Sequence, residues 1–565
     1  MNEMSASASG EPVDPIWVKS YMEGVDYNMD ITPEPVYKLL DDSVAKFPNN
    51  NCTSFKGKEL TYREIGNLVD RAAKGLQGQG IGKGSKVGLL LPNTPYYIIF
   101  YYAILKTGAT VVNFNPLYSV PELEHQVKDS GTEIMVTLDM KVTFNSTEKL
   151  LESGVLPKAI VCPMAQLLPG VTSILFKLFK GGDVAKYQSS SVASKVLKYN
   201  DIINNDGKFE PVAIDVNKDV ALLQYTGGTT GVPKGAMLSH ANLSYNAFQC
   251  IGWYTEGVPG QEIVIGILPL FHVFAMTAVM NFGIGMGGEI VLFPKFEIDT
   301  DIKVIHAKKP TLMPGVPTLF NGLMNYPKLD QYDFSSLRYC VSGGAPLPIE
   351  IKRGFEAISN CKISEGYGLS ETSPVATSNP PQKGKEGSIG TPVPLTIVSI
   401  RSLENPEQEM PLGERGEICI KGPQVMMGYW NKPEATAEVF VGDYLRTGDV
   451  GYMDDDGYIF IVDRIKDLIL CSGYNVYPRQ IEEAIYQYPG VEEVTVIGIP
   501  NQYRGEAPKA FIKMQDGKNA TSEEVMAFLK DKLSKIEMPE EIEFRDELPK
   551  TMIGKLSKKE LRQDA

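Results

Sequence analysis

The sequence predicts an α/β protein: a large N-terminal domain of parallel-sheet α/β subdomains with a small β-barrel-like element, followed by a small, mobile α+β C-terminal domain. Three observations lead to this prediction. At 565 residues the chain is too long for one hydrophobic core. Short apolar runs alternate with helical patterns, which is typical of parallel sheets covered by helices. Beyond Asp467 the chain is compact and repeatedly charged. We therefore expect domains at 1–466 and 467–565.

The first part of the chain contains four strand-length apolar runs, at 86–91, 109–112, 134–137 and 159–161. Helices are expected over 36–47, from Tyr62 to Leu76, and through Leu105. Thr61 stands three residues before Glu64, a spacing that predicts a capping box at the start of the second helix.

Later elements follow the same alternation. Strands are expected at 220–224, 263–268, 289–292 and 311–314. From about 396 to 420 short strands separated by turn signals predict a small antiparallel or barrel-like element. The C-terminal part contains a candidate strand at 494–497 and a candidate helix at 522–532.

Bulk composition excludes several function classes. A net charge of −14 argues against general nucleic-acid binding. The seven cysteines show no Cys-x-x-Cys spacing, which favours a reducing compartment over a disulfide framework or a zinc site. The N-terminus lacks the pattern of a signal peptide, and the longest apolar run, 96–105, is shorter than the roughly 20 residues of a spanning helix. We expect a cytoplasmic protein.

Residues 167–180 have two interpretations. Val171, Ile174, Leu175 and Leu178 share one helical face, and Lys177 and Lys180 can flank it. The segment is therefore either an interfacial helix that makes a peripheral membrane contact or a surface helix packed on its own domain. The second interpretation is the more common fate of such a helix, and only two lysines support the first.

The stretch 225–235, Tyr-Thr-Gly-Gly-Thr-Thr-Gly-Val-Pro-Lys-Gly, leaves the end of a predicted buried strand. Its glycines let the backbone approach a ligand closely, and its threonine hydroxyls and Lys234 supply donors around the same concavity. This composition suits a polyphosphate. It differs from a Walker A loop, because Lys234 lies between Pro233 and Gly235.

Six further motifs follow in order: 268–274 (Leu-Pro-Leu-Phe-His-Val-Phe), 342–348 (Ser-Gly-Gly-Ala-Pro-Leu-Pro), 366–372 (Gly-Tyr-Gly-Leu-Ser-Glu-Thr), 444–449 (Tyr-Leu-Arg-Thr-Gly-Asp), 462–467 (Val-Asp-Arg-Ile-Lys-Asp) and 549–555 (Pro-Lys-Thr-Met-Ile-Gly-Lys). With the 225–235 loop, this series resembles the adenylate-forming family of acyl-CoA synthetases, luciferase-like enzymes and peptide-synthetase adenylation domains. The resemblance looks closest to bacterial long-chain fatty-acid–CoA ligases.

The resemblance implies ATP, Mg²⁺ and CoA as ligands, and it implies roles for particular residues. Glu371 and Thr226 would hold Mg²⁺, Ser370 would touch the α-phosphate although many relatives have Thr there, and Tyr367 would stack on adenine. Asp449, expected at a loop, would accept hydrogen bonds from the ribose hydroxyls with support from Arg464. The β- and γ-phosphates would be held by Thr226, Gly227, Gly228, Thr229, Thr230, Gly231 and Lys234, and the adenine pocket would be shaped by Gly344, Ala345, Pro346, Glu365, Gly366 and Gly368.

Lys555 is the sharpest expectation. Without the resemblance it would be one of several solvated lysines near the C-terminus. The order Pro-Lys-Thr-x-x-Gly-Lys resembles the segment of the family's adenylation lysine, which bridges the substrate carboxylate and the α-phosphate. The family rotates its C-terminal domain about a hinge, here matched by Lys466, after which Ser472 and Gly473 would face the CoA channel.

His272 bears on the substrate. Amino-acid-activating relatives usually carry an aspartate in the corresponding motif, so His272 disfavours an amino acid, and in acyl-CoA synthetases the matching residue borders the acyl entrance. Apolar neighbours such as Phe274 suit an alkyl chain but also suit an ordinary core. The function predicted is a long-chain fatty-acid–CoA ligase. The alternatives are a medium-chain or aryl acid–CoA ligase and a non-catalytic acyl-binding or uptake protein.

Overall fold

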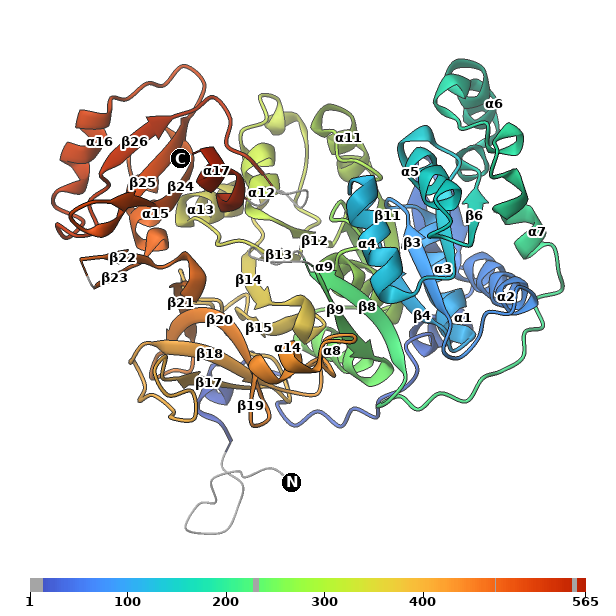
Figure 1. Cartoon of the computed structure of the whole chain (residues 1–565), viewed down its shortest axis with the longest axis horizontal. Coiled ribbons are helices and arrows are strands. Elements are labelled where there is room, and N and C mark those ends of the chain that lie inside the picture. The colour runs from blue at the N-terminus through green and yellow to red at the C-terminus, as the bar shows by residue number, and fades with distance from the viewer. Residues whose placement is uncertain (1–13, 227–232, 473, 551–555, 565) are drawn as a thin grey trace, which may run out of the picture.

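Two large sheets form the body of the molecule (Figure 1). The computed structural model describes residues 14–226, 233–472, 474–550 and 556–564. The first sheet has seven strands and is parallel except for its last pair. In spatial order its strands are β7 (Val196–Lys198), β6 (Lys158–Cys162), β5 (Ile134–Leu138), β3 (Lys86–Leu90), β4 (Thr110–Asn113), β8 (Val220–Thr226) and β9 (Lys234–Ser239).

The second sheet has nine strands, and its six central strands are parallel. In spatial order they are β16 (Thr391–Pro392), β15 (Val375–Ser378), β14 (Ile363–Gly368), β13 (Tyr339–Gly343), β12 (Leu312–Gly315), β10 (Ile263–Gly266), β11 (Glu289–Leu292), β1 (Asn51–Phe55) and β2 (Lys58–Thr61). The predicted parallel α/β body is confirmed.

Helices cover both sheets because their apolar faces must be buried. All twelve residues of α3 are buried, so the longest apolar run of the sequence, 96–105, belongs to a core helix. None of the helices within the described residues is long and apolar enough to cross a membrane. The helices of the body are α1 (Lys38–Lys46), α2 (Tyr62–Gly78), α3 (Pro95–Lys106), α4 (Val120–Ser130), α5 (Lys141–Glu152), α6 (Gly170–Phe179), α7 (Tyr199–Ile203), α8 (His240–Trp253), α9 (Val273–Ala275), α10 (Phe282–Gly285), α11 (Ile298–Lys308), α12 (Pro317–Met324), α13 (Ile349–Ser359) and α14 (Pro433–Glu438).

Local sequence signals are confirmed where they are strongest. The Thr61 hydroxyl accepts from the Glu64 backbone N–H, and the Glu64 carboxylate accepts from the Thr61 N–H at 2.8 Å, which completes the predicted capping box of α2. Residues 167–180 do contain a helix, α6, which lies at the periphery of the molecule.

A five-stranded antiparallel sheet lies below the body in Figure 1 and confirms the predicted small β element. Its strands are β17 (Ile397–Arg401), β18 (Gly416–Lys421), β19 (Phe440–Val441), β20 (Tyr444–Met453) and β21 (Ile459–Arg464). One prediction is wrong here: Asp449 is not in a loop but within β20, where it pairs with Arg464 of β21. Gly448, the residue before it, has a positive φ of 74° inside the strand.

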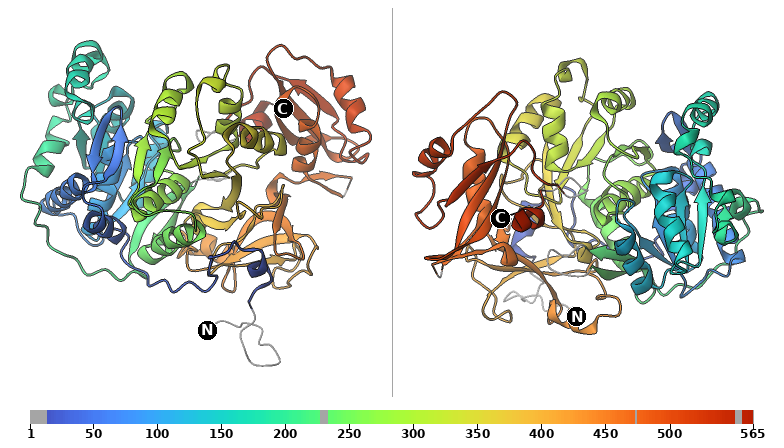
Figure 2. Two further views of the ribbon diagram at one scale, coloured as in Figure 1. Left: turned by 180° about the vertical axis from the view of Figure 1, so that it is seen from behind. Right: turned by 45° about the horizontal axis from the view of Figure 1, so that its top comes forward.

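The C-terminal unit forms a separate small sheet with its own core, seen at the upper left of Figure 1 and from two further sides in Figure 2. It contains β22 (Ile469–Cys471), β23 (Tyr474–Val476), β24 (Val491–Asn501), β25 (Gly505–Met514) and β26 (Glu541–Phe544), with α15 (Pro478–Tyr486), α16 (Ser522–Leu529) and α17 (Lys558–Asp564). The predicted helix 522–532 therefore ends three residues early. A short 3₁₀ turn, Ile465–Asp467, joins this unit to β21, so we propose the domain boundary at 466/467.

Candidate active site

A cleft of about 2340 Å³ lies where the body, the antiparallel sheet and the C-terminal unit meet. The carboxyl ends of β8, β13 and β14 open into it, as expected for a ligand site in an α/β sheet. Every described candidate residue except Ser472 lines this cleft: Thr226, Lys234, His272, Gly344, Ala345, Pro346, Glu365, Gly366, Tyr367, Gly368, Ser370, Glu371, Asp449 and Arg464. Residues spread over more than two hundred positions thus converge on one cavity.

The phosphate-loop candidates begin and end on an antiparallel hairpin. Thr226, the last residue of β8, pairs with Lys234, the first of β9, so both ends of the loop are held at the cleft. The Lys234 ammonium lies 5.1 Å from the centroid of the Tyr429 ring. The predicted residues Gly227, Gly228, Thr229, Thr230 and Gly231 lie outside the described residues.

Glu371 sits in a 3₁₀ turn directly after β14 and is 9% exposed. Its Oε1 accepts a hydrogen bond from the Tyr429 hydroxyl at 2.7 Å. Burial, and then the Glu371 carboxylate, raise the pKa of Tyr429, so this phenol stays protonated and donates. The hydrogen bond fixes one oxygen of Glu371 and leaves acceptor capacity on the carboxylate.

A single carboxylate suits Mg²⁺, which usually binds through one or two carboxylates, water and substrate phosphates. Within the described part of the chain no group of three or more His, Cys, Asp or Glu side chains could hold a metal alone. The donor set of Glu371 and Thr226 therefore fits an ion that arrives with a nucleotide and does not fit a permanent metal centre.

Asp449 is held from two sides. Its Oδ2 accepts from the Tyr367 hydroxyl at 2.6 Å, and its Oδ1 lies 3.3 Å from Arg464 Nε. Burial, and then the Asp449 charge, raise the pKa of Tyr367. The predicted support of Asp449 by Arg464 is present, and Tyr367 adds a contact that the sequence did not reveal. The carboxylate is 4% exposed and fixed in direction before any ligand arrives.

Close backbone approach explains one of the glycines. A Cβ on Gly368 would lie 1.7 Å from the Pro374 carbonyl oxygen, so no side chain fits there. Gly344 has a φ of +81°, which a side chain rarely adopts.

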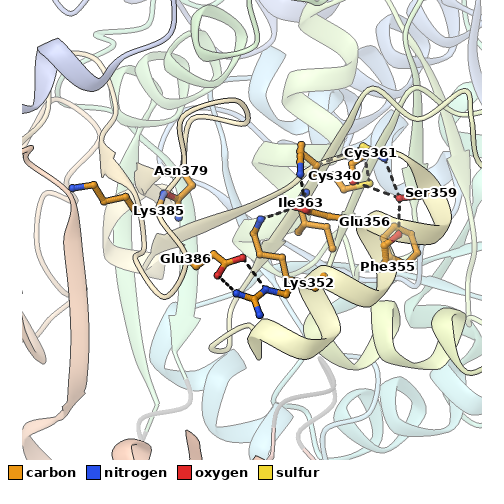
Figure 3. Close-up of polar contacts among 12 residues, drawn as sticks. Cys340, Lys352, Phe355, Glu356, Ser359, Cys361, Ile363, Asn379, Lys385 and Glu386 are labelled. Atoms are coloured by element: carbon orange, nitrogen blue, oxygen red, sulfur yellow. Dashed lines mark hydrogen bonds and ion pairs between the residues drawn. The ribbon is translucent and has the colours of Figure 1, made fainter. Parts of the chain in front are cut away.

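The loop 344–348 is positioned by α13, whose far end is tied to β14. Figure 3 shows Glu356 of α13 accepting from Lys352 at 2.6 Å and from the Ile363 backbone at 3.0 Å. Arg353 of the same helix forms a two-pronged pair with Glu386, at 2.6 and 3.1 Å. These contacts fix α13, and with it the loop that enters the cleft.

Glu365 is buried at the floor of this region, and its Oε1 accepts the Leu347 N–H at 3.2 Å. Burial raises the pKa of Glu365 to about 7, against the lowering effect of Arg479. The folded state therefore favours the neutral acid. The stability that the protonated Glu365 side chain contributes to the folded state is present at low pH and is lost as the pH rises through about 7.

We expect Glu365→Gln to flatten the pH dependence of stability. Between pH 5 and pH 8 the wild type should lose about 2 kcal/mol more unfolding free energy than the variant, because only the wild type must ionise a buried carboxyl. Melting temperatures measured across this range check the prediction. Glu350→Gln, at an exposed position on α13, is the control. Parallel pH profiles for wild type and Glu365→Gln would contradict it.

The C-terminal unit contributes the outer wall of the cleft. Leu556, Ser557 and Lys558 line it. Lys550 forms an antiparallel bridge with Leu556. Lys555 itself lies outside the described residues.

A charged cluster connects α17 to the 3₁₀ turn 465–467. The Lys558 ammonium lies 2.9 Å from Glu482 of α15, and Arg562 lies 2.8 Å from Asp467 of the 3₁₀ turn. Asp463, in β21 before this turn, accepts the Arg479 backbone N–H at 2.8 Å. These contacts tie α17 and α15 to the segment that joins the body to the C-terminal unit.

His272 lies at the cleft wall at the start of α9, where its Nδ1 accepts the Phe274 backbone N–H at 3.2 Å. Phe274 and Phe271 also line the cleft, which agrees with an apolar side to this region. Ser472 is exposed in the turn between β22 and β23, with a φ of +54°, and is not among the lining residues. Gly473 lies outside the described residues.

Sequence reasoning missed Tyr429, Asp463, Glu482 and Lys558. Tyr429 follows Gly428, whose φ of +132° and contact with Thr436 mark a special backbone position. The Gly-Tyr-Trp sequence at 428–430 was the available signal. Asp463 lies in the 462–467 motif but received no role of its own. Glu482 and Lys558 gave no signal, because they come from separate elements, α15 and α17.

A large α/β body, a small C-terminal unit and a cleft between them that holds these motif residues define an adenylate-forming ligase. Two family models match: "AMP-binding enzyme" over residues 40–430 and "AMP-binding enzyme C-terminal domain" over 480–555. The chain belongs to the AMP-binding enzyme family.

Named relatives are similar over the whole chain. The long-chain-fatty-acid–CoA ligase of Bacillus subtilis is 42% identical, with 96% of this chain and 97% of that protein covered. The long-chain-fatty-acid–CoA ligase of Escherichia coli O6:H1 is 38% identical, with 97% and 98% covered. Among solved structures, the anthranilate CoA ligase AuaEII in complex with anthranoyl-AMP matches with a TM-score of 0.83 at 26% identity, covering 95% of this chain and 98% of that chain.

Proposed function

We propose that the protein is a long-chain fatty-acid–CoA ligase. It would convert a fatty acid and ATP to acyl-AMP and pyrophosphate, and then acyl-AMP and CoA to acyl-CoA and AMP. Full-length similarity to ligases of that name supports the proposal. The structural observation that carries it is the meeting of Lys234, Glu371 and Asp449 in one cleft that Leu556 and Lys558 also line.

In the first step a carboxylate oxygen of the acid attacks the α-phosphorus of ATP, and the bond to pyrophosphate breaks. Negative charge on the phosphoryl oxygens must be stabilised and the two reactants held in line. Lys234 and Lys555 would supply positive charge, Ser370 a hydroxyl donor at the α-phosphate, and Asp449 two fixed acceptors for ribose hydroxyls. Tyr367 would then orient Asp449 as well as border adenine.

Glu371 and Thr226 would hold Mg²⁺ with the phosphates. The ion would neutralise phosphate charge, and Tyr429 would keep the Glu371 carboxylate in place through its hydrogen bond.

In the second step the CoA sulfur attacks the acyl carbon, and AMP leaves. Lys555 is needed at the α-phosphate only in the first step, so we propose that rotation at Lys466 withdraws it before CoA enters. Asp463 stands before the hinge and Arg479 after it, so this rotation would break their hydrogen bond. Ser472 and Gly473 would then reach the cleft, which explains why Ser472 lies outside it in the present arrangement.

The preference for a long-chain fatty acid is tested by comparing acids of different length and type. We expect pyrophosphate release with palmitate to exceed that with hexanoate and 4-coumarate by at least about 10-fold in kcat/KM, because each buried methylene contributes about 0.8 kcal/mol. The same measurement with fatty acids from decanoate to stearate locates the optimal chain length. A preference for hexanoate or 4-coumarate would favour the medium-chain or aryl acid ligase.

The non-catalytic alternative predicts acyl binding without ATP-dependent pyrophosphate release. The presence of Glu371, Asp449 and Lys555 together supports an enzyme, because a binding protein has no need of all three.

We further infer a reducing, cytoplasmic location with a peripheral membrane contact through 167–180. All seven cysteines are described and unpaired, and Figure 3 shows Cys340 and Cys361 with their Sγ atoms 3.5 Å apart. Two neighbouring thiols of this kind suit a reducing compartment.

A further inference from the structure

Helix α6 turns its apolar face outward. The exposed side chains recur at i, i+3, i+4 and i+7, which places them on one stripe, with Phe179 beside its end. On an ordinary surface helix this stripe would face the core. The stripe, called here the α6 patch, consists of Val171, Ile174, Leu175, Leu178 and Phe179, which are 74%, 61%, 46%, 71% and 81% exposed.

The helix is nevertheless fixed to the body. Phe176, on the opposite side, packs against the main hydrophobic core. The Ser173 hydroxyl donates to the Ala165 carbonyl at 2.7 Å, and the Ser173 N–H donates to Pro169 O at 2.7 Å. The outward direction of the patch is therefore set by packing on the far side of the helix.

Helix α6, which carries the patch, lies at the end of the molecule opposite the C-terminal unit, as Figures 1 and 2 show from three directions. A flat partner could reach it without touching the cleft or hindering motion of the C-terminal unit.

Charge around the patch favours an anionic partner. Residues 163–198 contain five lysines and one aspartate, whereas the whole chain has a net charge of −14. Lys180 directly follows the helix and is 68% exposed, at 3.8 Å from Asp183. An apolar stripe with neighbouring lysines complements the acyl boundary and headgroups of an anionic membrane.

The dimensions of the patch disfavour a protein partner. A ten-residue helix is about 15 Å long and about 10 Å wide, far less than the roughly 800 Å² per partner of a stable protein interface. A second copy of the chain would also bring a second net charge of −14. A lipid surface requires no matching relief, because side chains insert into it one by one.

We infer that α6 is an interfacial anchor that lies in the plane of an anionic membrane and inserts the α6 patch below the headgroups. This anchor would hold the body on the membrane while the C-terminal unit moves freely. The inference deepens the membrane contact proposed above for 167–180. It concerns a lipid surface and not the acid that the cleft activates, so its failure can be distinguished from failure of the proposed ligase activity.

Flotation of the purified full-length protein with vesicles tests it. We expect binding to vesicles of phosphatidylcholine and phosphatidylglycerol, and at least about 10-fold weaker binding to phosphatidylcholine alone. The double variant Ile174→Ser/Leu178→Ser should bind the anionic vesicles at least about 10-fold more weakly than wild type, because two inserted side chains are lost. Leu403→Ser/Leu412→Ser, which changes two exposed leucines elsewhere, should bind like wild type.

A reporter variant separates insertion from loose attraction. Phe179→Trp should show a blue-shifted emission with anionic vesicles and quenching by brominated acyl chains. ATP–pyrophosphate exchange with a soluble acid and the melting temperature should not change in any of these variants.

The inference is overturned if the wild type floats with neither vesicle, or if Ile174→Ser/Leu178→Ser binds as tightly as the leucine control. It is also overturned if the patch variant converts a dimer to a monomer without affecting vesicle binding, since a second copy would then be the occupant. If the wild type showed no ATP–pyrophosphate exchange, that result would instead count against the proposed function.

Discussion

Lys555→Ala should lose acyl-adenylate formation by about 10²- to 10³-fold while still converting a supplied acyl-adenylate to the thioester. Removal of one donor from a developing oxyanion typically has an effect of this size. The second half-reaction transfers the acyl group with AMP as leaving group, at which stage the C-terminal unit is proposed to have withdrawn this lysine. Pyrophosphate release measures the first step, and thioester formation from synthetic palmitoyl-AMP measures the second.

The control is Lys559→Ala, four positions further along and exposed at the start of α17. We expect both half-reactions to stay within about 2-fold of wild type, because a solvated lysine contributes little. Equal loss in both half-reactions of Lys555→Ala would indicate a general structural role. If Lys555→Ala kept the full adenylation rate, Lys555 would not be the adenylation lysine, and the non-catalytic acyl-binding alternative would return.

Glu371→Gln should reduce pyrophosphate release by about 10²-fold or more and should raise the Mg²⁺ concentration needed for half-maximal rate. The substitution keeps the shape of the side chain and a carbonyl acceptor for the Tyr429 hydroxyl, but it removes the negative charge that Mg²⁺ requires. Initial rates over a Mg²⁺ titration separate weaker metal binding from slower chemistry. Calorimetric titration with ATP, with and without Mg²⁺, provides a readout that does not depend on turnover.

Tyr429→Phe is the matched variant for Glu371→Gln. It keeps the carboxylate and the ring beside Lys234 but removes the 2.7 Å hydrogen bond that orients Glu371. We expect a loss of about 10-fold, the lower end of the range for residues that orient a metal ligand. If Glu371→Gln and wild type had the same Mg²⁺ dependence, another group would have to hold the ion.

Much of the fold could be predicted because strand-length apolar runs and helical periodicity are local signals. The strands at 134–138 and 158–162 and the capping box at Thr61 are examples. Asp449 was misplaced because strand pairing is not a local signal. β18 pairs with residues on both sides of Gly448, and β21 pairs with Asp449 and the residues after it, so the strand continues past a glycine with positive φ.

The candidate site was also predictable in part: its residues could be identified from sequence, and their contacts could not. The order of the motifs from 225 to 555 identified the residues that gather at the cleft, because each motif needs residue types that are recognisable in sequence. Their contacts were not accessible in this way. Tyr367 and Asp449 are 82 positions apart, and Tyr429 and Glu371 are 58 apart, so no local pattern links them.

By itself the sequence determined the family and the parallel α/β body and supplied the candidate residues, because the ordered motifs resemble those of the family and the alternation of strand and helix patterns is a local signal. Only the tertiary structure decided which oxygen of Asp449 and of Glu371 is held and by which phenol. It also decided which way α6 faces. An amphipathic stripe has the same periodicity whether it points inward or outward. The direction depends on the other side of the helix, where Phe176 packs against the main core and the Ser173 hydroxyl bonds to the Ala165 carbonyl.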